Sequence, residues 1–205
     1  MLFLKKHSFK IAVLALCAAM GIYLLVTYFG NQKESMPVLQ AAPAFTLNDI
    51  DGNEVSLEST NGKARLVYFY FANCPDVCPP TTFLLSETQD LLQKDGVLGK
   101  SAEMMSITFD PERDTPEVIR AFAERNFAEP GAGWLFLRGE EASTMKLATD
   151  FGVGVKKDEA NNSFIHFNVI TLVDKKGQIR KWISGNDEEL TPEQLAADLK
   201  QLAKE

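Results

Sequence analysis

The fold is decided by one stretch of the chain, Arg65-Leu-Val-Tyr-Phe-Tyr-Phe71-Ala-Asn-Cys74-Pro-Asp-Val-Cys78-Pro79-Pro80. Its first part, from Arg65 to Phe71, is a nearly continuous apolar and aromatic run, which is typical of a strand buried on both faces. The two prolines suit the first turn of a helix, because the φ angle of proline is already fixed near the helical value. The stretch therefore predicts a strand-to-helix junction that carries two cysteines.

Cys74 and Cys78 are four residues apart. On a helical turn this spacing places both side chains on one face, with Cβ atoms about 5–6 Å apart. The two sulfurs can then share a soft metal ion, or they can form a disulfide, which tolerates Cα separations of about 4.4–6.8 Å. Spacing alone leaves both alternatives open, together with a third in which the thiols are buried hydrophobic side chains.

Outward from this junction, the segments alternate between strand and helix. The expected elements are a hairpin (45–47 and 55–57), a helix from Pro79 to residues 95–96, a strand (104–109), a helix from Thr115 to about 127, a strand (134–137), a helix (141–151), a second hairpin (164–173 and 178–183) and a terminal helix from Thr191. This order suggests a thioredoxin-like α/β domain over residues 44–205, with an N-terminal hairpin and an inserted late hairpin.

In open α/β sheets, ligands bind at the carboxyl ends of the strands. Cys74 and Cys78 follow the first core strand, and Asp110 follows the next one. We therefore expect the two cysteines and the segment that begins at Asp110 to lie at the same edge of the sheet.

The N-terminal 30 residues form a separate segment. Residues 11–29 contain no charged residue, and 19 apolar-leaning residues are enough to span a bilayer as a helix. A cleaved signal peptide is the alternative, but no small-x-small site ends the run. Cys17 lies inside it and is interpreted as a membrane-buried apolar residue, because the bulky Leu16 precedes it where lipidation requires a small residue. Residues 31–43, with Pro37 and Pro43, are expected to be a linker.

Charge gives the expected orientation. Lys5, Lys6 and Lys10 precede the apolar run, which predicts a single-pass anchor in the cell membrane with a cytoplasmic N-terminus and an extracytoplasmic domain. The whole chain of 205 residues has a net charge of −7, so without these three lysines it has −10. It has no basic run dense enough to follow a phosphate backbone, which excludes nucleic acid as an expected partner.

Besides His7 in the basic flank, the chain has one histidine, His166, in an apolar strand-like segment. Two thiolates and one imidazole form a soft ligand set suited to Cu(I), and to Cu(II) with an added ligand. A structural zinc site normally closes with four protein ligands, and the chain outside the apolar run offers no third cysteine and no second histidine. Met104 and Met105 are interpreted as core residues.

Three motifs in this order resemble the Sco/SenC family of copper chaperones: Cys74-Pro-Asp-Val-Cys78-Pro, then Asp110-Pro-Glu-Arg-Asp-Thr-Pro116, then His166. The resemblance runs from about Pro43 to the C-terminus. It implies a thioredoxin-like scaffold, copper ligation by Cys74, Cys78 and His166, and a role in assembling the dinuclear CuA centre of cytochrome c oxidase subunit II, with an unknown copper donor.

The resemblance also implies a functional role for Asp110, in orienting the site or in meeting a partner; a turn or helix cap is its alternative, and Asp76 between the cysteines carries the same ambiguity. Many members of the family have Asp before and Ser after the histidine, where this chain has Ile165 and Phe167, and His or Tyr where this chain has Asn73. These departures affect the surroundings of the metal, and with them affinity and redox potential, more than the metal itself.

The competing function is that of an enzyme, a membrane-tethered thiol-disulfide oxidoreductase with Cys74 as nucleophile and Cys78 as resolving thiol. Redox thioredoxins usually carry two residues between the cysteines and a cis-proline that faces the pair. This chain has three, and it has no proline from Gly131 through Thr191. A peroxidase is a third alternative, which leaves His166 without a role. A metallochaperone rather than an enzyme is therefore the primary hypothesis, and both activities can coexist on the same thiols.

Overall fold

The computed structural model describes residues 2–30, 35–131 and 133–205 and divides the chain into two units, Met1–Ser35 and Met36–Glu205. The first unit contains helix α1 (Leu2–Gly30), and its segment Phe9–Val26 is long and apolar enough to cross a membrane. The predicted apolar N-terminal helix is therefore confirmed. The predicted linker 31–43 falls partly outside the described residues, at 31–34.

Within the predicted linker, residues 36–41 pack on the second unit and do not form a free connection. Strand β1 (Gln40–Ala41) pairs with a C-terminal strand, and the Leu39 N–H donates to the carbonyl of Ile179 at 2.9 Å. The buried Arg180 donates from Nε to the carbonyls of Met36 and Pro37. Residues 36–41 thus form an edge of the second unit.

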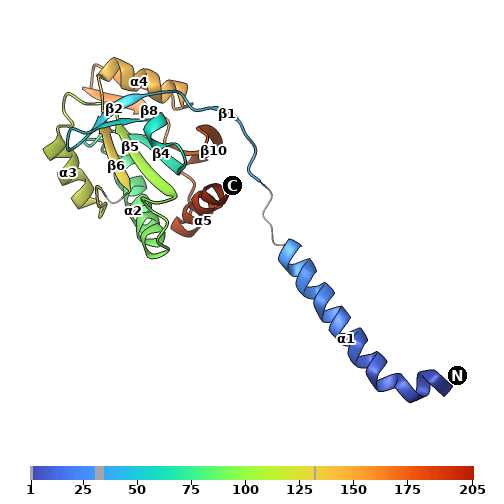
Figure 1. The fold of residues 1–205 in the computed structure, drawn as a ribbon. Helices are drawn as coiled ribbons and strands as arrows, with labels where there is room; N and C mark the ends of the chain where they lie inside the picture. The colour runs from blue at the N-terminus through green and yellow to red at the C-terminus, as the bar shows by residue number, and fades with distance from the viewer. Residues whose placement is uncertain (1, 31–34, 132) are drawn as a thin grey trace. The chain divides into compact units, whose positions relative to one another are not determined.

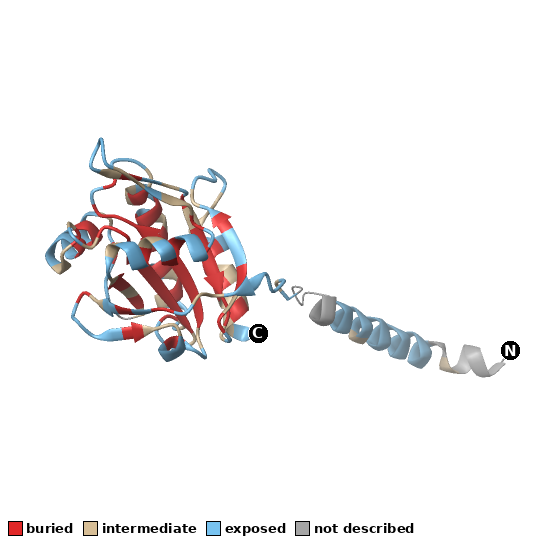
Figure 2. Ribbon diagram, turned by 90° about the horizontal axis from the view of Figure 1, so that it is seen from above, coloured by how far each residue is buried: buried red, intermediate tan, exposed pale blue. Residues whose placement is uncertain are grey.

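The main sheet of the described residues has eight strands, in the order β1-β10-β9-β4-β5-β6-β2-β3 (Figure 1). After β1, its strands are β2 (Thr46–Asp49), β3 (Glu54–Ser56), β4 (Ala64–Tyr70), β5 (Ala102–Thr108), β6 (Trp134–Arg138), β9 (Val169–Val173) and β10 (Gln178–Ser184). Strands β4, β5 and β6 are parallel, and β9 lies antiparallel to β4. Every residue of β4 and β5 is buried, as the apolar run predicts, and these strands form the red centre of Figure 2.

The register between β4 and β5 positions the site. Tyr70 pairs with Thr108, so the two parallel strands end side by side. The chain leaves β4 toward Cys74 and leaves β5 toward Asp110. The prediction that both segments lie at the same edge of the sheet is therefore confirmed.

Helices cover both faces of the sheet. They are α2 (Cys78–Lys94), α3 (Pro116–Arg125), α4 (Glu141–Asp150) and α5 (Pro192–Lys204), with a short 3₁₀ turn at Glu58–Thr60. Neighbouring residues of a strand point to opposite faces. Tyr70 stacks on Phe122 of α3, whereas Phe69 packs on Phe151, directly after α4. Helices α2 and α5 contact each other, and Figure 1 shows them on the side of the sheet opposite α4.

One expected strand is wrong. Residues 164–173 form not one strand but two: β8 (Ser163–His166) pairs with β7 (Val155–Asp158) in a separate sheet, and β9 joins the main sheet. The break has a physical cause at Phe167 and Asn168. The Phe167 N–H donates to the carbonyl of Gly154, next to β7. The side-chain amide of the buried Asn168 donates to Thr81 and Asn186, so the chain turns away from the β7–β8 sheet at Asn168. The expected second hairpin is β9–β10, and the β7–β8 hairpin is additional.

Candidate metal centre

The cysteines lie where α2 begins. Cys78 is the first residue of α2, whereas Cys74 lies in the loop before it. Cys74 therefore does not share a helical turn with Cys78, contrary to the prediction from their spacing. The loop nevertheless turns back, because the Cys74 N–H donates to the carbonyl of Phe71 at 3.2 Å. Both cysteines are free thiols, and both are buried, with exposed fractions of 8% and 0%.

His166 completes a cluster with the two thiols. The candidate ligand atoms of Cys74, Cys78 and His166 all lie within 4.8 Å of one another. The His166 Nε2 atom is 3.6 Å from the Cys78 Sγ atom. The structure thus brings together the three residues that the sequence analysis selected, although β8 lies far along the chain from the β4–α2 junction.

The imidazole is held from two sides. Its Nδ1 atom lies 3.1 Å from the carbonyl oxygen of Phe167. Because a carbonyl only accepts hydrogen bonds, this contact assigns the proton to Nδ1 and leaves the Nε2 lone pair facing the thiols. The ring also packs edge-on against Phe71 and Phe109, with centroids 6.0 and 5.2 Å away. The ring orientation is therefore fixed by the fold.

The two thiols differ in their protonation. A hydrogen bond from the Cys78 thiol lowers the pKa of Cys74 to about 4, against the opposing effect of burial. Burial, and then the neighbouring Cys74 thiolate, raise the pKa of Cys78 far above its usual value. The Cys78 thiol therefore holds its proton more tightly than the Cys74 thiol. A metal ion that binds both sulfurs must displace this proton.

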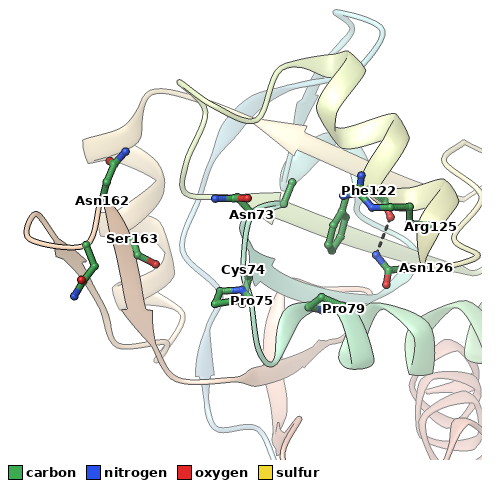
Figure 3. Close-up of a pocket in the computed structure, with 11 residues that line it drawn as sticks. Asn73, Cys74, Pro75, Pro79, Phe122, Arg125, Asn126, Asn162 and Ser163 are labelled. Carbon is green, nitrogen blue, oxygen red and sulfur yellow. Dashed lines mark hydrogen bonds between the residues drawn. The ribbon is translucent and has the colours of Figure 1, made fainter.

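Cys74 faces an open groove of about 700 Å³, and Cys78 is not among the residues that line it (Figure 3). One wall is the loop from Ala72 to Pro75 with Pro79, the second is the end of α3, and the third is the tip of the β7–β8 hairpin. Cys74 is therefore the sulfur that a solute in the groove meets first.

Asp110 is buried (2% exposed) but does not belong to the ligand cluster. Burial raises its pKa, against the effect of Arg113, which donates from Nε to Asp110 Oδ2 at 2.5 Å. The same guanidinium donates from Nη1 to the carbonyl of Asn162, at the tip of the β7–β8 hairpin. Asp110 therefore holds the Arg113 guanidinium, which in turn binds the hairpin that carries His166. Asp76 is exposed and lies in the loop between the cysteines.

The next carboxylate holds the cysteine loop. Asp114 Oδ2 accepts a hydrogen bond from the Ala72 N–H at 3.0 Å and one from the Thr108 hydroxyl at 2.5 Å. One short turn, residues 110–114, is thus tied to both segments that carry the candidate ligands. Of these residues, Asp110 was predicted from the sequence to have a role, whereas the contacts of Arg113 and Asp114 are evident only in the structure.

Asn168 is a further residue that the sequence analysis missed. Its Oδ1 accepts a hydrogen bond from the Tyr68 hydroxyl at 3.1 Å, and its amide donates to Thr81 Oγ1 of α2 at 2.9 Å. It thereby ties the chain just after His166 to the strand and helix that flank the cysteines. The sequence feature that could have indicated this role is the amide of Asn168 in an otherwise apolar segment, because a buried amide requires hydrogen-bond partners.

The buried carboxyl of Asp114, in the turn at residues 110–114, predicts a pH dependence of the free energy of unfolding. Burial raises the pKa of Asp114 to about 6, although two hydrogen bonds oppose the shift. The unfolded carboxyl loses its proton at lower pH than the folded one, so the free energy of unfolding should fall as the pH rises from about 4 to 6, by up to about 3 kcal/mol. Asp114→Asn should remove this dependence. Urea unfolding at pH 4 and pH 7 measures this pH dependence, and Asp90→Asn, at an exposed aspartate, is the control. Equal pH dependence in wild type and Asp114→Asn would contradict the assignment of the effect to Asp114.

The donor set fits copper. Two sulfurs and one imidazole nitrogen are soft donors, and in the described residues the cluster holds three of them rather than the four of a closed structural zinc site. A position next to the groove remains accessible through Cys74. Such a set suits an ion that must enter and leave.

Comparison with known proteins gives consistent matches. A family model described as SCO1/SenC matches residues 33–204. The SCO1 protein homolog of Bacillus subtilis (strain 168) is 31% identical over 166 residues, which cover 80% of this chain and 84% of the relative.

Solved structures agree in fold. BsSco, a member of the Sco family of cytochrome c oxidase assembly proteins in which a disulfide switch was identified, matches with a TM-score of 0.71 at 29% identity, over 84% of this chain and 99% of that chain. Bradyrhizobium japonicum ScoI, solved with copper bound, matches with a TM-score of 0.66 at 31% identity, over 79% and 99%. The predicted thioredoxin-like fold is thereby confirmed.

Proposed function

Because the chain belongs to the SCO1/SenC family, we propose that it is a copper chaperone that binds copper through Cys74, Cys78 and His166. In this proposal it helps to assemble the CuA centre of cytochrome c oxidase, and subunit II is its acceptor. The observation that carries the proposal is the convergence of three soft donor atoms within 4.8 Å at the strand-end edge of the sheet. Copper is the cargo of this site, so the site must both hold it and release it.

The protein's own groups have distinct tasks in this exchange. Cys74, ionised and facing the groove, offers the first thiolate to an incoming ion. Cys78 contributes the second sulfur and gives up its proton. His166 supplies the Nε2 lone pair, which the contact of Nδ1 with Phe167 keeps available. Release reverses these steps, and reprotonation of Cys78 helps to expel the metal.

The proposed location is the extracytoplasmic face of the cell membrane. The apolar helix α1 is the proposed single-pass anchor, and Lys5, Lys6 and Lys10 before it favour a cytoplasmic N-terminus. This orientation places the thiols of the second unit outside the cytoplasm, where an acceptor centre at the outer face of the membrane is accessible.

The proposal is tested with the full-length chain in detergent. Anaerobic titration against a Cu(I) chelator should give one tightly bound copper per chain, and Cu(II) in air should give a thiolate-to-Cu(II) absorption band. Cys17→Ser, which changes the cysteine in α1, is the matched control and should behave as wild type. Absence of stoichiometric binding, or loss of binding in Cys17→Ser, would overturn the proposal.

A second candidate function, thiol-disulfide exchange, is favoured by one observation. Cys74 combines access to the groove with a pKa lowered to about 4, and the buried Cys78 thiol lies beside it. This asymmetry suits an attacking and a resolving thiol. The full-length chain reduced at both thiols would then reduce a model disulfide, and Cys78→Ser would stop at the mixed disulfide. Failure of wild type to reduce any disulfide would exclude it.

Arg113→Ala tests the positioning role of the 110–114 turn. Without the guanidinium, the tip of the hairpin loses its hydrogen bond at Asn162, and Phe164 loses a cation 5.9 Å from its ring centroid. We expect the Cu(II) affinity to fall about tenfold, at the lower end of the range for groups that orient metal ligands, with a shifted absorption band.

The control for Arg113→Ala is Arg120→Ala, which removes an exposed arginine paired with Asp51. Arg113→Lys should restore part of the affinity, because lysine keeps the charge but not the two-sided contact. If Arg113→Ala binds Cu(II) with the affinity and spectrum of Arg120→Ala, the turn does not position the site.

A further inference from the structure

Phe127 adopts a backbone conformation that phenylalanine rarely takes. Its φ angle is +58°, in the left-handed region, and it directly follows the C-cap of α3. The Ala128 N–H donates to the carbonyl of Ala123, which closes the helix end, and the left-handed position of this motif is usually Gly or Asn. The Phe127 side chain is nevertheless 73% exposed. The fold thus keeps a strained phenylalanine whose ring contributes little to the core.

A second exposed phenylalanine lies beside it. Phe83 of α2 is 44% exposed, and its ring meets that of Phe127 edge-on, with centroids 5.7 Å apart. Pro79, one helical turn before Phe83, and Asn126, directly before Phe127, both line the groove that leads to Cys74 (Figure 3). The aromatic pair therefore continues the groove wall formed by α2 and α3.

The groove differs from the rest of the domain in charge. Met36–Glu205 has ten more acidic than basic residues, yet the groove is lined by no Asp or Glu and by one basic side chain, that of Arg125. Arg125 makes no ion pair within the described part of the chain. The lining also includes the amides of Asn73, Asn126, Asn161 and Asn162, which can both donate to and accept from a peptide backbone.

We propose that the groove and the Phe83–Phe127 pair together form a docking site for an extended polypeptide segment of a partner protein. The segment places a cysteine at Cys74, an acidic side chain at Arg125 and an apolar side chain on the aromatic pair. The proposal deepens the proposed function, since it describes how a partner presents its thiol to the thiol that faces the groove. Electrostatic and apolar complementarity then select the partner.

The test uses the full-length chain in detergent with Cys17→Ser and Cys78→Ser, so that Cys74 is the remaining thiol. The probes are synthetic peptides whose single cysteine is linked by a disulfide to thionitrobenzoate. The Cys74 thiolate attacks the peptide sulfur, a mixed disulfide forms, and thionitrobenzoate leaves as an absorbing thiolate. One peptide carries Glu and Leu near its cysteine, and the matched peptide carries Lys and Ser.

The acidic apolar peptide should react about tenfold faster than the matched peptide, although an acidic group near a disulfide by itself slows attack by a thiolate. Dithiodipyridine, a small disulfide that does not extend along the groove, serves to correct for the reactivity of Cys74. Equal corrected rates for the two peptides would overturn the proposal. The assay contains no copper, so its failure and a failure of copper binding are separate results.

Phe127→Gly separates an effect on docking from an effect on stability. Glycine relieves the left-handed strain, so the melting temperature should stay the same or rise, while the rate with the acidic apolar peptide falls toward that of the matched peptide. Arg125→Ala should lower the same rate, and Val118→Ala, at an exposed apolar residue of α3 outside the groove lining, should not. An unchanged rate in Phe127→Gly would overturn the proposal. So would a wild-type dimer that Phe127→Gly dissociates, because the pair would then bind a second copy of the chain.

Discussion

Copper binding is expected to be lost when Cys78 is replaced by serine. Cys78 is fully buried, lies 3.6 Å from the His166 Nε2 atom and is the hydrogen-bond partner that most lowers the pKa of Cys74. Serine keeps the shape of the side chain but offers a hard oxygen that copper binds poorly. The loss of Cu(I) affinity should exceed the roughly 10–100-fold that removal of a group supporting a ligand costs.

Competition with a Cu(I) chelator measures this loss in the full-length chain, and thermal unfolding of the metal-free protein verifies that the variant is folded. Cys17→Ser is the matched control, since it makes the same chemical change in α1. A folded Cys78→Ser variant with wild-type Cu(I) affinity would mean that the Cys74–Cys78–His166 cluster is not the copper site.

The two junction cysteines and the lone histidine were predictable because their chemistry is unusual for their positions. The strand that precedes Cys74 is a continuous apolar run, and the register of β4 with β5 follows from parallel pairing of two such runs. The sheet edge at which Cys74 and Asp110 meet is a general property of open α/β sheets. These parts of the site therefore follow from local patterns.

The groups that hold the candidate ligands in place were not predictable in the same way. In the sequence, Arg113 is an ordinary polar residue of a turn. Its contact with the hairpin depends on the carbonyl of Asn162, which lies 49 residues further along the chain. The break after His166 depends on Phe167 and Asn168 finding partners on Gly154 and α2. Apolar periodicity carries no information about such long-range hydrogen bonds, so residues 164–173 read as one strand.

The break also explains how a histidine in an apolar segment comes to lie beside the two thiols. In a continuous strand, His166 would be one more residue of the main sheet. Because β8 pairs with β7 and not with the main sheet, His166 lies at the base of the β7–β8 hairpin, with its candidate ligand atom within 4.8 Å of those of the two cysteines. Phe164 anchors this hairpin by packing on Phe71 and Phe109, the two aromatic residues that also contact the imidazole. The aromatic cluster thus couples the position of the imidazole to the core.

His166→Ala should separate the two oxidation states of copper. Two thiolates can retain Cu(I), which prefers soft ligands, whereas Cu(II) prefers nitrogen and oxygen donors in addition. We therefore expect the Cu(II) affinity to fall by more than about 100-fold, beyond the effect of a supporting group, and the thiolate-to-Cu(II) band to disappear. The Cu(I) affinity should fall by about tenfold or less.

His7→Ala, at the other histidine of the chain, is the matched control, and both variants are compared by Cu(I) chelator competition and by the absorption spectrum in air. The ratio of the two losses carries the argument, because a general distortion of the site would weaken both oxidation states alike. A His166→Ala variant that keeps the wild-type Cu(II) band and affinity would show that the imidazole, although its Nε2 atom faces the thiols, is not a ligand. The cysteine pair would then be the whole site, and thiol-disulfide exchange would become the leading function.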